Sequence, residues 1–235
     1  MFSEGSGLML RKFKELPLDM QNDAVKYYYE IISKRTISLL LKRLFDIVVS
    51  LTMLLLLWPI MLVLAIIIKI DSQGPVFYRQ ERVTQYGRRF RIYKFRTMVN
   101  NADKIGTLVT TNNDSRVTKV GSVIRKIRVD EIPQLLNILV GDMTFVGTRP
   151  EVVKYVEKYT DEMKATLLLP AGVTSLASIY YKDEDKLLSD AADVDSTYIN
   201  EILPQKMKYN LDAIRDFSFF GDIKTMIMTV VAVLK

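Results

Sequence analysis

Residues 47–68 read IVVSLTMLLLLWPIMLVLAIII, a run of 22 residues without a charged side chain. A helix needs about 20 apolar residues to cross the hydrocarbon core of a bilayer. A core helix of a soluble protein is rarely apolar on every face over such a length. The run starts too late and is too long for a signal peptide, and it lacks a small-residue cleavage site. We therefore predict that this segment inserts into a membrane.

The topology of the inserted segment depends on Pro59, which lies near the centre of the run. A proline in a helix removes one backbone hydrogen bond and clashes with the preceding turn, although spanning helices tolerate such kinks. Basic residues flank the run on both sides, and such residues mark the cytoplasmic side of a membrane segment. A kinked span remains open, but the flanking charges favour a helix that enters, breaks at Pro59 and returns to the same face.

The 235-residue chain contains no cysteine and no histidine. These absences exclude disulfides, thiolate or imidazole metal sites, cysteine nucleophiles and histidine bases. An enzyme of this composition must use carboxylates, lysine, arginine, hydroxyls, backbone groups or an oxygen-ligated metal. Mg²⁺ or Mn²⁺ fits such ligands better than Zn²⁺ does.

The net charge of +6 is unevenly distributed along the chain. Residues 71–130 carry 13 basic and 5 acidic side chains, whereas residues 131–235 carry 11 basic and 16 acidic ones. The basic stretch suits anionic lipid headgroups, a phosphorylated substrate, or simply a solvated face. Nucleic acid is not an expected partner of a membrane-embedded chain with an acidic C-terminal half.

The remaining sequence predicts a helix-dominated α+β protein. Alternation of apolar and charged residues in 76–83 and 88–98 predicts two short strands joined by the turn QYG. Further helices are expected over residues 20–43, from about 130 to 141, over 151–165, over 196–216 and in the final segment DIKTMIMTVVAVLK, which could pack on the protein or lie at the membrane interface. Residues 1–20 and 100–117 are expected to be loosely structured.

The adjacent carboxylates Asp130 and Glu131 follow several basic residues and precede Pro133. One interpretation is a capped helix start, for which aspartate and a first-turn proline are both favourable. The same placement suits phosphate chemistry, because a helix N-terminus and arginines attract anions and should keep a nucleophilic carboxylate ionised. Neighbouring helical side chains point about 100° apart, so one carboxylate could attack phosphorus while the other holds a metal.

Three weaker candidates lie elsewhere in the sequence. Lys94 and Arg96 of YKFRTM share one face of the expected strand, where both could reach one phosphate; the alternative is an exposed basic face. GTRPE places Arg149 and Pro150 in a turn, where the arginine could meet a phosphate, a uracil edge or a salt-bridge partner. The small residues of PAGVTSLAS could line a pocket.

A series of motifs occurs in a fixed order over residues 42–235: KRLFD, the proline-containing apolar run, DSQGPVFYRQERV, FRIYKFRTM, NDSRVTKVGSVIRK, VDEIPQLLNILVGDMTFVG and TRPE. Together they resemble the bacterial sugar transferase family, the monotopic phosphoglycosyl transferases that start capsule, exopolysaccharide and glycoprotein glycan assembly. The combination of KFRTM with DEIPQL and the following glycine-rich and RPE segments is highly specific.

The resemblance implies transfer of a sugar 1-phosphate from a UDP-sugar to undecaprenyl phosphate, with UMP as the second product. It implies a covalent aspartyl-phosphosugar intermediate and Mg²⁺ as the metal. Asp130 matches the family nucleophile, and Glu131 matches its Mg²⁺-engaging partner. The resemblance also matches substrate-side positions to Lys94, Arg125, Gln134, Arg149, Pro150 and Asp195.

The resemblance further matches Pro59 to the break of a re-entrant helix, which places both helix ends in the cytoplasm at the bacterial inner membrane. The expected organisation is an interfacial segment over 1–43, a re-entrant helix over 44–70 and a cytosolic catalytic domain over 71–235 with C-terminal interfacial helices. Expected partners are the two substrates, a second copy of the chain in a homodimer, and downstream glycosyltransferases. The large N-terminal membrane domain of long members is not expected.

Two departures from the family pattern affect the substrate side. Thr148 stands where the family's PRP motif has its first proline, and PAGVTSLASI replaces the usual PGITG(W/L)AQV.

Two other classes of protein remain as alternatives: a membrane-anchored scaffold that binds anionic lipid or phosphate without catalysis, and a bitopic adapter with a soluble phosphate-binding domain. The joint presence of Asp130, Glu131, Arg125 and Lys94 argues against a decayed scaffold.

Overall fold

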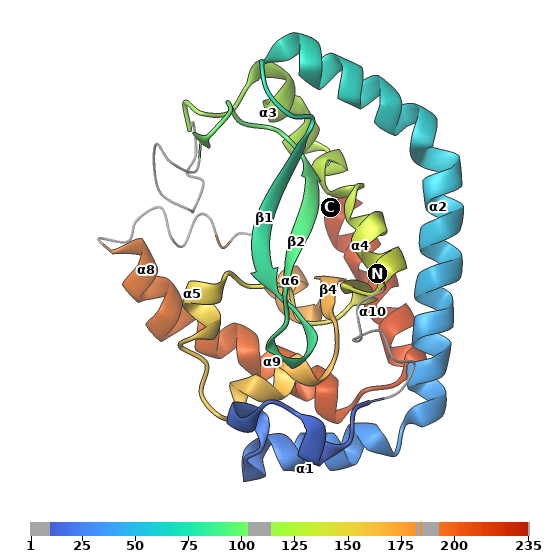
Figure 1. Cartoon of the computed structure of the whole chain (residues 1–235), viewed down its shortest axis with the longest axis vertical. Helices are drawn as coiled ribbons and strands as arrows, with labels where there is room; N and C mark the ends of the chain where they lie inside the picture. The colour runs from blue at the N-terminus through green and yellow to red at the C-terminus, as the bar shows by residue number, and fades with distance from the viewer. Residues whose placement is uncertain (1–9, 103–113, 182–183, 185–192, 235) are drawn as a thin grey trace.

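The computed structural model describes residues 10–102, 114–181, 184 and 193–234. Within these residues helices dominate, and two small two-stranded sheets accompany them (Figure 1). This confirms the predicted α-dominated α+β class. The helices include α1 (Asp23–Ser33), α2 (Thr36–Asp71), α3 (Lys119–Lys126), α4 (Gln134–Val140), α5 (Val153–Val156), α6 (Leu176–Tyr180), α8 (Val194–Thr197), α9 (Leu203–Arg215) and α10 (Phe219–Leu234). The strands are β1 (Phe77–Val83), β2 (Arg89–Phe95), β3 (Met143–Val146) and β4 (Ala171–Thr174).

Helix α2 contains the whole apolar run and extends beyond it at both ends. Its 36 residues correspond to a length of about 54 Å. Among the described residues, it is the one helix long and apolar enough to cross a membrane. The helical backbone continues through Pro59 rather than breaking there, and the ribbon bends in its second half (Figure 1). A proline removes one hydrogen bond and crowds one turn, which can bend a helix without ending it.

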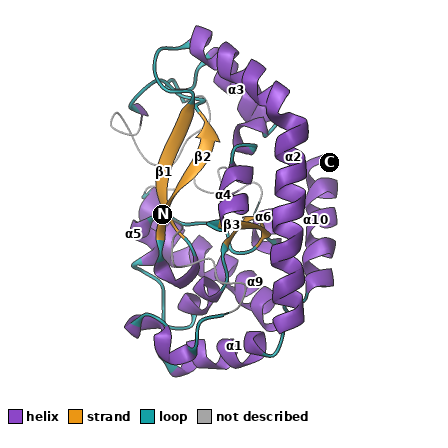
Figure 2. Cartoon of the chain, turned by 45° about the vertical axis from the view of Figure 1, so that its right-hand side comes forward, coloured by secondary structure: helices purple, strands orange, loops and turns teal. Residues whose placement is uncertain are grey.

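One face of α2 packs on the rest of the chain on both sides of Pro59. Before the proline, Leu54 and Leu57 contact buried residues of β2, α4 and β3. After it, Met61 and Leu64 contact buried residues of β2 and α3. The opposite face of α2 is apolar and exposed, and α10, which lies beside α2 in Figure 2, also carries exposed apolar side chains. These exposed residues include Leu55, Trp58 and Leu62 of α2 and Ile227, Val230 and Val231 of α10.

Charged side chains near the start of α2 join the helix to the domain. Lys42 Nζ donates hydrogen bonds of 2.6 Å both to the carbonyl oxygen at the end of β3 and to Asp222 Oδ2 of α10. The Asp46 carboxylate accepts hydrogen bonds from the Thr144 hydroxyl at 2.7 Å and from the next backbone N–H at 3.1 Å. Arg43 donates to two carbonyl oxygens near the end of α4, at 2.7 and 2.9 Å. The KRLFD motif therefore attaches α2 to β3, α4 and α10.

The predicted strand pair is confirmed. Strands β1 and β2 pair antiparallel, with Phe77 opposite Phe95 and Val83 opposite Arg89. The turn predicted at QYG is a 3-10 turn over Gln85–Gly87.

The second sheet was not predicted from the sequence. Strands β3 and β4 pair in parallel, with Met143 opposite Ala171 and Val146 opposite Thr174. The two backbone segments approach closely just after β3, where a Cβ on Gly172 would lie 2.1 Å from the backbone nitrogen of Gly147. Only glycine fits so close an approach. Part of PAGVTSLAS is thus the strand β4. The prediction that this segment lines a pocket is confirmed, because Val173, Thr174 and Ser178 line the cavity described below.

The helix predictions succeed in part. The helix expected over 196–216 is confirmed by α9 and the π-helical turn Tyr198–Ile202 before it, and the final segment forms α10. The helix expected over 20–43 is divided into α1 and the start of α2. The single helix expected over 151–165 is wrong: α5 covers only four residues. The Thr160 hydroxyl accepts a hydrogen bond from the N–H of Met163 at 3.3 Å, a local bond that competes with helix continuation.

The N-terminal segment packs onto the same core as the rest of the chain. Tyr28 and Ile32 of α1 lie in one apolar cluster with Leu168, Leu203 and other buried residues of the C-terminal half. Helix α1 accordingly lies next to α9 (Figure 1). Residues 10–33 therefore contribute directly to the core on which α9 rests.

We predict that Lys42→Met lowers the stability of the folded chain by about 3 kcal/mol, because it leaves the Asp222 carboxylate buried without its cation. Thermal unfolding in detergent or nanodiscs measures the change. The double variant Lys42→Met/Asp222→Leu should recover most of the loss, and the exposed Lys34→Met should have no effect. An unchanged melting temperature for Lys42→Met would contradict the prediction.

Candidate active site

The carboxylate pair lies in a 3-10 turn, Val129–Glu131, between α3 and α4. The turn follows Arg128, whose backbone is left-handed with φ of 58°. The expected helix start at Asp130 is therefore corrected to Gln134. Pro133 has no N–H to donate to the Val129 carbonyl, four residues earlier. The carbonyl instead accepts a 3-10 hydrogen bond from the N–H of Ile132, three residues later, at 3.3 Å. The predicted helix end at Gly141 is confirmed, with φ of 88°.

Glu131 lies between two cations from different parts of the chain. Its Oε1 accepts hydrogen bonds from Lys94 Nζ of β2 at 2.7 Å and from Arg149 Nη2, after β3, at 2.8 Å. Burial alone would raise the pKa of the Glu131 carboxyl, but the charges of Arg149 and Lys94 outweigh burial and hold that pKa well below its usual range. Glu131 is thus a stable carboxylate.

Asp130 has a different environment from its neighbour. Burial and the charge of Glu131 raise the pKa of the Asp130 carboxyl, while Lys94 and Arg125 lower it. The cations that we expected to keep Asp130 ionised are present, but the net shift is upward. The two adjacent carboxyl groups therefore have opposite pKa shifts, which makes their roles unequal.

A cavity of about 570 Å³ opens beside Glu131. Arg149, Pro150 and Gln134 line it together with Glu131. Gln134 is buried, and its Nε2 has no hydrogen-bond partner among the described residues. An amide donor without a partner at a cavity wall suits a ligand that brings an acceptor oxygen.

The lining of this cavity combines apolar and charged side chains from several elements. Met53 of α2 and Ala232 of α10 come from the two helices whose outer faces are exposed and apolar, and Phe145 of β3 lines the cavity with them. The charged residues Arg82 of β1 and Lys206 of α9 also line it. One cavity therefore offers both apolar surface and charged groups.

Five residues that the sequence placed in the site lie outside this lining. Two of them adjoin its Glu131: Asp130 precedes it in the chain, and Lys94 bonds to it. The other three are Arg96, Arg125 and Asp195. Arg96 does not share a surface with Lys94, because β2 ends at Phe95 and the guanidinium of Arg96 turns to the end of α2. There its Nη2 donates to the Ser72 carbonyl oxygen at 2.6 Å. Arg125 belongs to α3 and lies close enough to Asp130 to lower its pKa. Asp195 is bound by Lys154 and by the Tyr155 hydroxyl at 2.7 Å, and of these Tyr155 lines the cavity.

The structure also brings residues to the cavity that sequence reasoning missed. Glu151 lines it from the loop after β3, and Tyr198 and Lys206 line it from the continuous helical stretch of the π-helical turn and α9. Glu151 is the last residue of the GTRPE motif, and its place directly after Arg149 and Pro150 was the sequence signal that could have identified it as a site residue. The other two carry no local pattern that distinguishes them from core or surface residues of a helix.

Arginine, lysine and glutamine donors around paired carboxylates define a site suited to phosphate groups. Comparison with known proteins specifies the family. The family model of the bacterial sugar transferases matches residues 37–235, and the chain belongs to this family.

Curated relatives agree with this assignment. The chain is 36% identical over 197 residues to a UDP-N-acetylgalactosamine-undecaprenyl-phosphate N-acetylgalactosaminephosphotransferase of Aeromonas hydrophila, covering 83% of this chain and 44% of that protein. It is 37% identical over 200 residues to a UDP-glucose:undecaprenyl-phosphate glucose-1-phosphate transferase of Klebsiella pneumoniae, covering 83% and 40%. It is 34% identical to the uncharacterised sugar transferase EpsL of Bacillus subtilis, covering 83% and 88%. The chain thus spans less than half the length of the first two relatives.

Proposed function

We propose that this protein transfers a sugar 1-phosphate from a UDP-sugar to undecaprenyl phosphate and so begins the assembly of a capsule, exopolysaccharide or other glycan. The observation that carries the proposal is the mixed cavity, in which Glu131, Arg149 and Gln134 share one space with apolar residues of α2 and α10. A water-soluble nucleotide sugar needs the polar groups, and a polyprenyl acceptor needs apolar surface. The names of the relatives from Aeromonas and Klebsiella support both substrate classes.

The proposed chemistry proceeds in two displacements at one phosphorus atom. In the first, an Asp130 carboxylate oxygen bonds to the sugar-bearing phosphorus, the diphosphate P–O bond breaks, and UMP leaves with its oxygen. In the second, an oxygen of undecaprenyl phosphate bonds to the same phosphorus and releases Asp130. The acceptor is already an anion, so positioning and charge neutralisation matter more than a general base. Arg149, Lys94 and Gln134 would supply the neutralising and positioning donors.

We also propose Mg²⁺ as the metal. The described residues contain no cluster of three acidic side chains that could hold an ion by themselves. Mg²⁺ fits the two adjacent carboxylates nonetheless, because it commonly binds through one or two carboxylates together with substrate phosphates. Both hydrogen bonds described for Glu131 end on Oε1, so Glu131 would offer its other oxygen. When bound, Mg²⁺ would neutralise charge on the diphosphate.

The proposed topology keeps both ends of α2 on the cytoplasmic face of the inner membrane. The domain packs on α2 both before and after Pro59. If α2 crossed the bilayer in one pass, charged segments packed along it would enter the hydrocarbon core, at a cost of several kcal/mol for each unpaired polar group. A bent helix that dips into one leaflet avoids this cost, and its exposed apolar face would contact lipid.

We expect Asp130→Asn to abolish turnover and covalent capture of the phosphosugar, because an amide is too weak a nucleophile. UMP release from a UDP-sugar and mass spectrometry of the protein measure the two effects. The exposed Asp161→Asn is the control and should behave as the unmodified chain. Retained UMP release by Asp130→Asn would refute the nucleophile assignment.

We expect Glu131→Ala to lower kcat/KM by about 10²-fold or more, because Lys94 and Arg149 lose the carboxylate that positions them. The deficit should persist across a magnesium titration. The exposed Glu157→Ala is the matched control. Near-normal turnover of Glu131→Ala at low magnesium would contradict the proposed role.

We expect single cysteines at Lys34 and Gln73, which are exposed and flank α2, to react with an impermeant maleimide from the same side of the membrane. The chain has no native cysteine that would interfere. Both variants should be labelled in inverted vesicles and protected in spheroplasts. Labelling of the two positions from opposite sides would overturn the re-entrant topology.

A further inference from the structure

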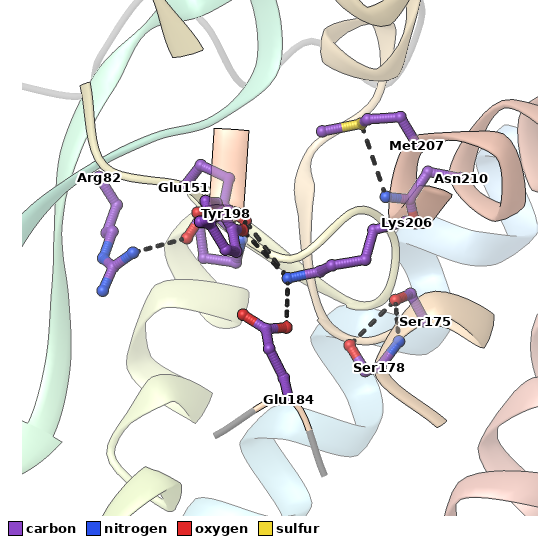
Figure 3. Close-up of polar contacts among 10 residues, drawn as sticks. Arg82, Glu151, Ser175, Ser178, Glu184, Tyr198, Lys206, Met207 and Asn210 are labelled. Atoms are coloured by element: carbon purple, nitrogen blue, oxygen red, sulfur yellow. Dashed lines mark hydrogen bonds and ion pairs between the residues drawn. The ribbon is translucent and has the colours of Figure 1, made fainter. Parts of the chain in front are cut away.

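A buried polar cluster forms the wall of the cavity near α9 (Figure 3). Lys206 is 7% exposed, Tyr198 4% and Glu151 8%. Lys206 Nζ donates to the Tyr198 hydroxyl at 3.1 Å and to Glu184 Oε2 at 2.8 Å, and lies 3.7 Å from Glu151 Oε1. The Tyr198 hydroxyl in turn donates to Glu151.

Stability alone gives little reason for such a cluster. Removing charges from water costs free energy that their mutual attraction often fails to repay, and apolar side chains of similar volume are commonly as stable. All four members nevertheless line one cavity, where Glu151 and Glu184 meet Tyr198 and Lys206 of the helical stretch that ends in α9. This placement points to a ligand that the cluster contacts.

The chemistry of the cluster differs from that of the Glu131 region. Around Glu131, Lys94, Arg149 and the cavity-lining Arg128 give an excess of positive charge, which suits phosphates. Around Lys206, by contrast, the negative charges of Glu151 and Glu184 balance the positive charges of Lys206 and the nearby Arg82. The Tyr198 hydroxyl adds a neutral hydrogen-bonding group. Burial and Glu151 raise the pKa of Tyr198, so its hydroxyl stays protonated. Balanced donors and acceptors suit a neutral ligand rich in hydroxyl groups.

The two regions are adjacent along the chain. Arg149, Pro150 and Glu151 all line the cavity; the first bonds to Glu131 and the last to Tyr198. The Cα atoms of residues two apart lie at most about 7 Å from each other. A sugar ring attached to a phosphate spans a comparable distance, so a phosphate held beside Arg149 would place its sugar near Glu151.

We propose that Glu151, Tyr198 and Lys206 form the subsite that binds the sugar ring of the nucleotide-sugar donor. This inference rests on the proposed function, because it assigns one part of the same donor to one part of the cavity. The subsite contacts hydroxyl or acetamido groups of the sugar and leaves the uridine and the diphosphate to other residues.

The test compares binding of UDP-sugars with binding of UDP, which lacks the sugar. Titration calorimetry uses UDP-glucose, UDP-galactose and their 2-acetamido counterparts, in the Asp130→Asn background so that the donor is not consumed. Lys206→Met should raise the Kd of the best UDP-sugar about tenfold and that of UDP less than about twofold. Tyr198→Phe, which removes a single oxygen, should act in the same direction by a smaller factor.

Two results would overturn the subsite: equal weakening of UDP and UDP-sugar, which would assign the cluster to the nucleotide, and unchanged binding of both, which would make it structural. Lys208→Met, on the exposed face of the same helix, is the matched control. Retained UDP binding shows that a variant is folded, and Tyr198→Phe decides the matter if Lys206→Met does not fold. Failure of the proposed function would show differently, as absent UMP release by the unmodified chain with every donor.

Discussion

The rest of the structure depends on the buried ion pair between Lys42 of α2 and Asp222 of α10. Apolar contacts alone could let a long hydrophobic helix slide or rotate against its domain, because they are not directional. The ion pair, together with the hydrogen bond from Lys42 to the end of β3, sets one position of α2 along the domain. The same contacts hold α10 against α2, and these two helices contribute Met53, Ala232 and Val233 to the apolar lining of the cavity.

This attachment also determines where the charged groups lie. Strand β3 ends at Val146, and the chain passes through Gly147 before it reaches Arg149. The close contact between Gly147 and Gly172 leaves little freedom in that passage. Arg149 therefore reaches Glu131 from a backbone that is held on one side by α2 and on the other by β4. The position of α2 and the geometry of the site are consequences of one set of contacts.

The sequence predicted features that depend on local pattern and missed those that depend on distant pairing. Alternation identified β1 and β2, and motif order placed Glu131 with Lys94 and Arg149. Strands β3 and β4 have only four residues each, too few for a periodic signal. Arg96 was misplaced because alternation was extended past the end of β2. The Lys206 cluster was missed because Glu151 and Glu184 approach Tyr198 and Lys206 only through tertiary packing.

The apolar lining contributed by α2 and α10 bears on where the two products of the proposed reaction go. On the proposed function, the acceptor reaches the site from the bilayer, and the lipid-linked product keeps its polyprenyl chain there. That product and the next enzyme then search for each other in two dimensions, so their densities in the membrane, rather than bulk concentrations, set the encounter rate. The nucleotide product departs into water, and the two products separate into different phases as soon as they are formed.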